Sequence, residues 1–234
     1  FGWQFNFDYE QVFVQVIWAI GWSMVFLAAL IYFPFYAILF VGLLMIFGHN
    51  LLDGIKAEGL GGDGMLWYIV HEAGLITYGN YTMFVLYPLI PWIGVMATGY
   101  CFGKVLQQEE TKRNTQLFMI GGGAILLFII IRAINIYGDP MPWTVQGNWY
   151  RTVLSFINCE KYPPSLLYLL MTLGPAILIM PLLEKANNRI GRFFTVYGRV
   201  PLFYYILHIY LLHTMAIVLA SMLGLPMDYF TDNS

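Results

Sequence analysis

Two polar residues in the first quarter of the chain have the types and spacing needed for proton transfer. His49 and Asp53 lie four residues apart in the run GHNLLD, so on a helix they share one face. An imidazole oriented by a carboxylate is the arrangement that a general base requires. We therefore predict His49 and Asp53 as catalytic residues and Asn50, between them, as a substrate-binding residue. The alternative is an ordinary cap of the helix end at the membrane interface, in contact with lipid headgroups.

A second set of polar residues follows a long apolar run. Arg132 comes directly after AILLFIII, and Asn135 and Asp139 follow it. An arginine beside such a run needs an anionic partner or a water-filled cavity, and Asp139 could reach it by folding back over the helix end. We predict that Arg132, Asn135, Asp139 and the later Lys161 bind substrate. The alternatives are a structural ion pair or snorkelling for Arg132, and interfacial anchoring for Lys161.

The last apolar segment holds a third candidate. Tyr204 and His208 are four residues apart and share a helix face, whereas His213 is five positions from His208 and cannot chelate a metal with it. We predict His208 as catalytic and Tyr204 as substrate-binding, and the alternative is a core histidine with an internal partner. Cys101 and Cys159 form no CxxC pattern, so no metal site is predicted.

The elements that must position these residues are apolar. Of the 234 residues, 59% are hydrophobic and 10% charged, whereas a soluble domain carries about a quarter charged residues. Apolar runs near the ~20 residues that cross a bilayer recur along the chain. We predict an all-α, polytopic transmembrane bundle of one domain, residues 1–234. Its six expected spans are Gln11–Ile31, Phe35–Leu52, Met83–Val105, Gln116–Tyr137, Ser165–Leu183 and Val200–Leu223.

The positions of Lys and Arg predict the orientation of these spans. Seven of the eleven lie on one side of the predicted bundle and three in the loops of the other, while Arg132 falls within a span. Because positive residues are retained in the cytoplasm, the first side is expected to be cytoplasmic and both chain ends to face outward. The two outer loops, around residues 53–82 and 138–164, are expected to form short re-entrant or interfacial helices.

The basic residues of the cytoplasmic side could also bind a ligand. We predict that they receive the phosphates of a nucleotide-like donor, and the alternative is that they only set the topology. The net charge of −2 gives no electrostatic footprint for nucleic acid. The predicted donor-binding residues are Lys112, Arg113, Arg189, Arg192 and Arg199.

Longer strings make the chain resemble a known family over nearly its whole length. They are GHNLLD at 48–53, YPLIPWIGVMATGY at 87–100, INIYGDPMPW at 134–143, KYPPSLLYLLMTLGP at 161–175 and GRVPLFYYILHIYLLH at 198–213. Together they resemble the bacterial branch of the heparan-alpha-glucosaminide N-acetyltransferase catalytic-domain family. The resemblance implies a multi-pass acyltransferase, in the bacterial inner membrane, that takes an acetyl group from acetyl-CoA on the cytoplasmic side and passes it to a glycan acceptor near the outer face.

One feature of that family is missing from this sequence. Its members normally begin with further spans, including an Asp-x-x-Arg-Gly start of the first helix, so we expect this chain to be the C-terminal part of a larger acyltransferase-like domain. A catalytic histidine could then lie in the missing spans. Two other functions remain open: a transporter or flippase that binds its substrate without covalent chemistry, and a structural membrane subunit.

Overall fold

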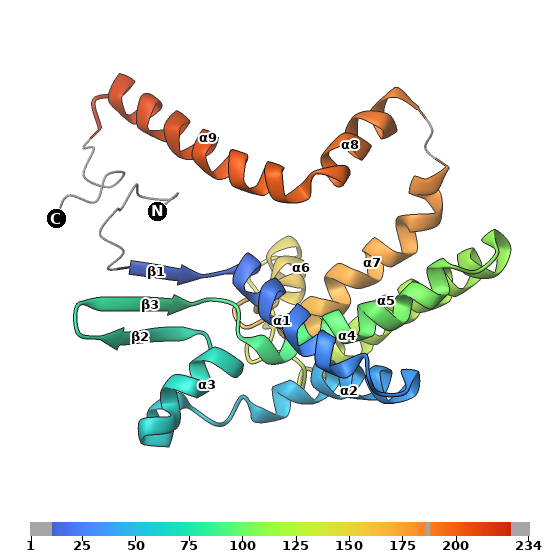
Figure 1. The fold of residues 1–234 in the computed structure, drawn as a ribbon, viewed down its shortest axis with the longest axis horizontal. Coiled ribbons are helices and arrows are strands. Elements are labelled where there is room, and N and C mark those ends of the chain that lie inside the picture. Colours follow the sequence, from blue (N-terminus) through green and yellow to red (C-terminus); the bar gives the residue numbers. More distant parts are fainter. Residues whose placement is uncertain (1–10, 186–187, 226–234) are drawn as a thin grey trace. The chain divides into compact units, whose positions relative to one another are not determined.

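The computed structural model describes residues 11–185 and 188–225, and most of them are helical (Figure 1). The two chain ends, predicted to face outward, lie outside the described residues. Three strands are present: β1 (Gln11–Val14), β2 (Gly74–Tyr78) and β3 (Tyr81–Val85). The helices are α1 (Val16–Leu30), α2 (Phe35–Gly48), the 3₁₀ helices η1 (His49–Leu52) and η2 (Ala57–Asp63), α3 (Gly64–Val70), α4 (Leu89–Leu106), α5 (Glu110–Ile134), α6 (Trp149–Ile157), α7 (Leu166–Glu184), α8 (Arg189–Arg199) and α9 (Pro201–Met222).

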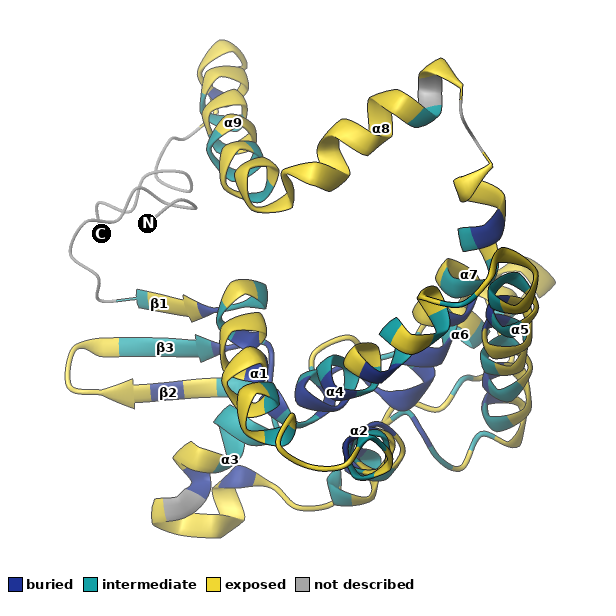
Figure 2. Cartoon of the chain, turned by 45° about the vertical axis from the view of Figure 1, so that its right-hand side comes forward, coloured by how far each residue is buried: buried dark blue, intermediate teal, exposed yellow. Residues whose placement is uncertain are grey.

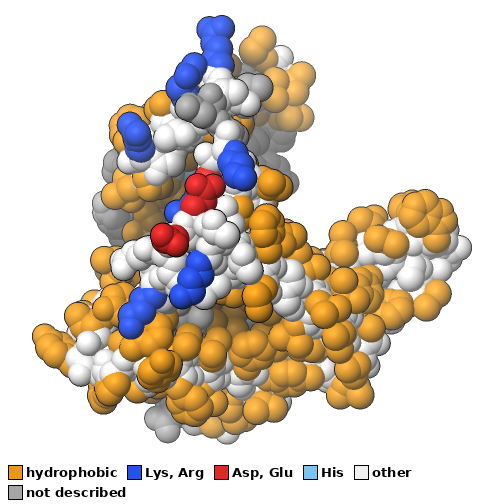
Figure 3. Space-filling model, turned by 90° about the vertical axis from the view of Figure 1, so that its right-hand side faces the viewer, with side chains coloured by type: hydrophobic (Ala, Val, Ile, Leu, Met, Phe, Trp, Pro, Cys, Tyr) orange, Lys and Arg blue, Asp and Glu red, His pale blue; other side chains and the backbone are white. Residues whose placement is uncertain are grey.

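Five of these helical segments are long and apolar enough to cross a membrane, which confirms the predicted polytopic helical fold. They are α2 continued by η1, α4, α5, α7 and α9, and the apolar α1 is shorter. Hydrophobic side chains cover much of the lower part of the face shown in Figure 3, as expected of helices whose solvent is lipid. In the described part of the chain, α6 and α3 supply short helices in the two loops where interfacial helices were expected.

Two predicted spans begin too early. Residues 11–14 form β1, and residues 83–85 end β3, so the corresponding helices begin only at Val16 and Leu89. The strands pair in the order β1-β3-β2, and Gly79, with a φ of 60°, turns the β2–β3 hairpin. Phe13 and Phe84 stack across β1 and β3 with ring centroids 4.6 Å apart. Short runs of aromatic and β-branched residues favour this pairing, which an apolarity pattern alone does not distinguish from a helix start.

The chain divides into two compact units. The larger consists of residues 13–77 and 83–181, and it holds α1 to α6 and most of α7. The described residues of the smaller unit are 11–12, 78–82, 182–185 and 188–225, and they include α8 and α9. Residues of α8 and α9 are mostly exposed, whereas α2, α4, α5 and α7 each carry a buried face (Figure 2).

Glycines set the close packing of the larger unit. A Cβ added to Gly42 of α2 would lie 2.5 Å from Thr98 Oγ1, and one added to Gly94 of α4 would lie 3.0 Å from Gly42 O. A Cβ on Gly121 of α5 would lie 2.8 Å from Gly174 O of α7. Small residues let membrane helices approach this closely. The chain therefore forms two tightly crossed helix pairs, α2 with α4 and α5 with α7.

Both pairs are antiparallel, so the larger unit has two chemically different ends. At one, which we call the polar end, α2 and α5 finish and α4 and α7 begin, and Leu166 N donates to Asn50 Oδ1 at 2.9 Å. At the other, which we call the basic end, Lys104 Nζ lies 3.5 Å from the centre of the Phe35 ring. Lys112 and Arg113 lie in the first turn of α5 at this basic end. The polar residues proposed above from the larger unit therefore lie at one end, opposite these cations.

Candidate functional site

At the centre of the polar end, the carboxylate of Asp53 lies in hydrogen-bonding distance of the His71 ring. Asp53 follows η1 directly, and its Oδ1 lies 3.2 Å from His71 Nε2. Its Oδ2 accepts a 2.8 Å hydrogen bond from Asn50 Nδ2. Burial raises the pKa of Asp53, but the hydrogen bonds from His71 and Asn50 outweigh it, so the pKa lies below its usual value. Asp53 is therefore held in its ionised form.

His71 has one ring nitrogen occupied and one free. The side chain is buried, with Trp67 packed against it at a ring distance of 4.9 Å. Nε2 faces Asp53, whereas the buried Nδ1 has no hydrogen-bond partner among the residues that the structure describes. When Nε2–H donates to the carboxylate, Nδ1 carries the lone pair. A histidine oriented by a carboxylate in this way can accept a proton from a substrate group.

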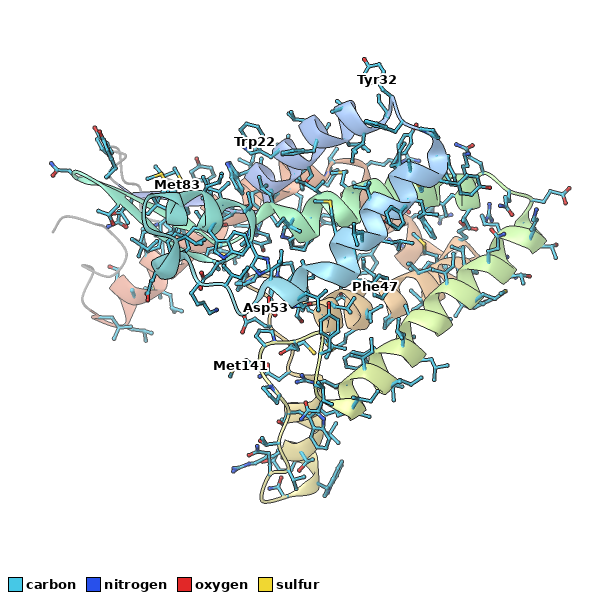
Figure 4. The ribbon with its side chains drawn as sticks, turned by 90° about the horizontal axis from the view of Figure 1, so that it is seen from below. Trp22, Tyr32, Phe47, Asp53, Met83 and Met141 are labelled. Atoms are coloured by element: carbon cyan, nitrogen blue, oxygen red, sulfur yellow. The ribbon has the colours of Figure 1, made fainter. Side chains whose placement is uncertain are left out.

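This pair lines a small cavity of about 60 Å³. The cavity also presents Lys56 and Glu72, which form an ion pair at 3.4 Å, and Glu72 Oε2 accepts a hydrogen bond from Ala57 N. Pro140, from the loop after α5, and Pro163, just before α7, form part of the wall. Figure 4 shows Asp53 and Met141 at this end of the bundle and Tyr32 at the opposite end of α2. The site thus joins three loops that are distant in sequence.

His49 lies next to this pair but has different partners. Its Nε2 lies 3.0 Å from Pro164 O, and its Nδ1 lies 3.0 Å from Ile46 O and 3.1 Å from Met45 O. The side chain is buried, and its ring centre is 6.3 Å from that of His71. Asp53 therefore orients His71, whereas His49 Nε2 lies against Pro164 O at the start of α7 and His49 Nδ1 faces carbonyls of its own helix, α2.

Arg132 is buried at the end of α5, with 1% of its side chain exposed. Its guanidinium donates to Phe156 O at 2.8 Å, to Asn158 O at 2.7 Å and to Ser155 O at 3.2 Å, which are carbonyls of the last turn of α6 and the residue after it. It also donates to Met141 O at 3.0 Å. Arg132 does not line the 60 Å³ cavity. In this arrangement it satisfies carbonyls that the end of α6 would otherwise leave unpaired.

Asp139 folds back over the end of α5, as the sequence suggested, and lies 3.7 Å from Arg132 Nη1. Its Oδ2 accepts from Ser165 Oγ at 2.7 Å and from Glu160 N at 2.8 Å. Burial raises the pKa of the adjacent Cys159 thiol to about 11. Asn135, at a φ of 58°, exchanges two 3.0 Å hydrogen bonds with the backbone of Trp143. Asp139 and Asn135 therefore shape the loop that leads to α7.

Lys161 lies at the edge of the polar end. Its Nζ is 4.9 Å from the centre of the Tyr162 ring, and a hydrogen bond to the Tyr162 hydroxyl raises the pKa of Lys161. The same bond, with a further one from Tyr87, lowers the pKa of Tyr162. The rings of Tyr87 and Tyr162 meet edge to face at 5.4 Å. Lys161 thus presents a positive charge at the surface beside the cavity wall.

The remaining predicted site residues fall into two places. Lys112 and Arg113 lie at the basic end of the larger unit. Tyr204 and His208 lie on α9 in the smaller unit, where their rings stack at 5.2 Å and His208 Nδ1 lies 3.0 Å from Tyr204 O. Their roles stay predictions, as do those of the cations of α8, which are Arg189, Arg192 and Arg199.

His71 and Glu72 were missed as site residues because they lie in a loop, where apolar periodicity gives no guidance. The one available signal was a titratable pair, His71-Glu72, next to the aromatic run Trp67-Tyr68 in a loop longer than a helix connection needs. Among the described residues, no three His, Cys, Asp or Glu side chains are grouped so that they could hold a metal ion.

Comparison with known proteins identifies the family. No curated protein and no solved structure matches the chain. The family model described as "Heparan-alpha-glucosaminide N-acetyltransferase, catalytic" matches residues 2–137, a segment that contains Asp53, His71 and Arg132. The match covers more than half of the sequence. The chain therefore belongs to the heparan-alpha-glucosaminide N-acetyltransferase catalytic-domain family, whose members are acyltransferase-like membrane proteins.

Proposed function

We propose that this protein transfers an acyl group, most simply acetyl, from acyl-CoA to a sugar of the cell envelope. Family membership supports the reaction class. The observation that carries the proposal is the Asp53–His71 pair. His71 lines a cavity, Asp53 faces its Nε2, and its Nδ1 has no hydrogen-bond partner among the described residues. Acyl transfer from a thioester needs a base that removes a proton from the attacking hydroxyl or amine, and this pair can supply it.

In this reaction the four charged or titratable side chains of the cavity have separate roles. The sugar hydroxyl or amine attacks the thioester carbonyl carbon while His71 Nδ1 takes its proton. The new C–O or C–N bond forms, the C–S bond breaks, and the leaving thiolate takes the proton from His71. The ionised Asp53 stabilises the transient imidazolium. Lys56 and Glu72 offer a donor and an acceptor for the other hydroxyl groups of the sugar.

Other residues support this site from further away. His49 and Arg132 direct their hydrogen-bonding groups at backbone carbonyls, which suits positioning residues. Lys112 and Arg113, at the basic end, are suited to the phosphates of acyl-CoA, whose thioester would then extend along the bundle to meet the sugar at the polar end. We propose that this basic end faces the cytoplasm of a bacterium, so that the protein lies in the inner membrane and meets the sugar at its outer face.

The test uses full-length protein in lipid vesicles, with acetyl-CoA as donor and glucosamine as acceptor. Release of free CoA thiol and formation of acetylated sugar are both measured. We expect His71→Gln and Asp53→Asn to lower the rate by about 10²–10⁴-fold, the usual contribution of a general base. Glu58→Gln is the matched control, because Glu58 is exposed in the same loop and does not line the cavity.

Two results would overturn the proposal. One is a folded His71→Gln protein with wild-type transfer. The other is movement of the sugar across the vesicle membrane in the absence of any acyl donor, with no acetylated product when the donor is added, which is the behaviour of a transporter. His208→Ala, made in parallel, tests the separate prediction for the histidine of α9.

A further inference from the structure

A long apolar groove runs between α1 and α4, apart from the polar cavity. Its volume is about 390 Å³, within the ~300–1,000 Å³ typical of ligand sites. Its walls include Ala19 and Ser23 of α1 and Trp92, Met96 and Gly99 of α4. Almost all of the wall surface is apolar, so water would find few hydrogen-bond partners inside. The groove lies between helices of the membrane-embedded bundle, and its walls suit a hydrocarbon chain.

Two polar atoms interrupt these apolar walls. The Ser23 side chain is 1% exposed, and its Oγ has no hydrogen-bond partner among the described residues. Trp92 Nε1 is likewise buried and unpaired in the described part of the chain. An indole N–H can only donate, so its partner must be an oxygen or another acceptor. Trp92 lies in the first turn of α4, at the polar end, so the acceptor belongs near the polar end of the groove.

The groove is connected to the acid–base pair through two tyrosines. Tyr87 lines the groove, and its ring packs edge to face on that of Tyr162 at 5.4 Å. The residue after Tyr162 is Pro163, which lines the cavity of Asp53 and His71. A molecule that lay in the groove with its polar group beside Trp92 would therefore have the rings of Tyr87 and Tyr162 between that group and the wall of the proposed active site.

We propose that the groove holds one hydrocarbon chain of a lipid-anchored sugar, and that this lipid-anchored sugar is the acceptor. The inference rests on the proposed acyl transfer, because it names the class of acceptor that reaches the Asp53–His71 cavity. The apolar walls take the chain, Trp92 Nε1 donates to an oxygen of the linkage between chain and sugar, and the sugar extends past Tyr87 toward His71.

The test measures occupancy directly and needs no transfer. Full-length protein is placed in phosphatidylcholine vesicles that contain a glucosyl diacylglycerol with a photoactivatable diazirine in one acyl chain, and no acyl-CoA is added. After illumination, mass spectrometry locates the labelled peptides. We expect labelling concentrated on α1 and α4 at the groove, and weaker labelling in Trp92→Phe, which keeps an aromatic ring but loses the N–H donor.

A pair of glycine variants gives the matched comparison. An added Cβ meets nothing within 4 Å at either Gly99, which lines the groove, or Gly21, which does not. A leucine at Gly99 displaces roughly two methylene groups of the bound chain at ~0.8 kcal/mol each, so Gly99→Leu should lower labelling at the groove by about tenfold. Gly21→Leu should leave it at the wild-type level.

Three outcomes would overturn the inference. The first is no labelling at the groove, and the second is labelling of Gly99→Leu at the wild-type level. The third is that phosphatidylcholine with the same diazirine chain labels the groove as strongly as the glucosyl diacylglycerol, which would mean a structural lipid only. Acetylation of free glucosamine separates the two proposals. Transfer to the free sugar without groove labelling refutes only the lipid-anchored acceptor. Groove labelling by the sugar lipid, with no transfer to any acceptor, refutes the acyltransferase.

Discussion

Replacement of Arg132 by methionine should destabilise the protein strongly. Arg132 and Asp139 are both 1% exposed, and the guanidinium donates to four backbone carbonyls at 2.7–3.2 Å. Methionine fills most of the volume but leaves Asp139 and these carbonyls without their partner. Removing one member of a buried ion pair costs about 3–5 kcal/mol. At ~2–4 °C per kcal/mol for a chain of this size, the apparent melting temperature should fall by about 6–20 °C.

The assay is thermal unfolding of detergent-solubilised protein, followed by tryptophan fluorescence and checked by size-exclusion chromatography. Arg151→Met is the control, because Arg151 is an exposed arginine of α6. The double variant Arg132→Met/Asp139→Asn should regain part of the loss, since it no longer buries an unpaired carboxylate. A melting temperature equal to that of the wild type in Arg132→Met would refute this account and return Arg132 to the substrate-binding role predicted from the sequence.

Three further predictions concern pH, reactivity and packing. Because the pKa of Asp53 in the folded protein lies below its usual value of 3.8, the ionised carboxylate stabilises the fold at a pH above 3.8. This contribution is lost as the pH falls through the lowered pKa of the folded state. The melting temperature should therefore drop more steeply in acid for the wild type than for Asp53→Asn. With its pKa raised to about 11, Cys159 should react slowly with maleimide at pH 7 in the folded protein and rapidly after denaturation, as mass spectrometry can measure. Gly42→Ala should lower the free energy of unfolding by about 1–3 kcal/mol, because the new Cβ would meet Thr98, whereas Gly21→Ala, with open space around it, should not lower it.

The helical membrane fold was predictable because length and apolarity alone identify a segment that must cross lipid. The segment Phe35–Leu52 was predicted with the bounds that the structure shows. β1 and the end of β3 were assigned to helices because residues 11–14 and 83–85 precede the apolar runs of α1 and α4 directly. Pairing between strands is a non-local interaction, and a hydrophobicity pattern carries no signal that separates four strand residues from an early helix start.

The candidate site shows the same division between local and non-local information. Asp53 was identified from its spacing to His49, but its partner is His71, which the 3₁₀ helix η2 and α3 bring back to it. The approach of Asp139 to Arg132 was foreseen because only a short turn separates them. The α6 carbonyls that bind Arg132 could not be foreseen, since nothing in the sequence of α6 indicates which helix end it will pack against.

The bonds at the polar end also bear on how the bundle can move. Asn50 and His49, at the end of α2, bond to the backbone of Leu166 and Pro164, at the start of α7, and Tyr137 donates to Phe47 O nearby. These bonds tie the two helix pairs together beside Asp53. If the α2–α4 pair rotated against the α5–α7 pair, the pivot would lie at the polar end. The basic end could then widen around a bulky donor while the distance between the Asp53 carboxylate and the His71 ring stays constant.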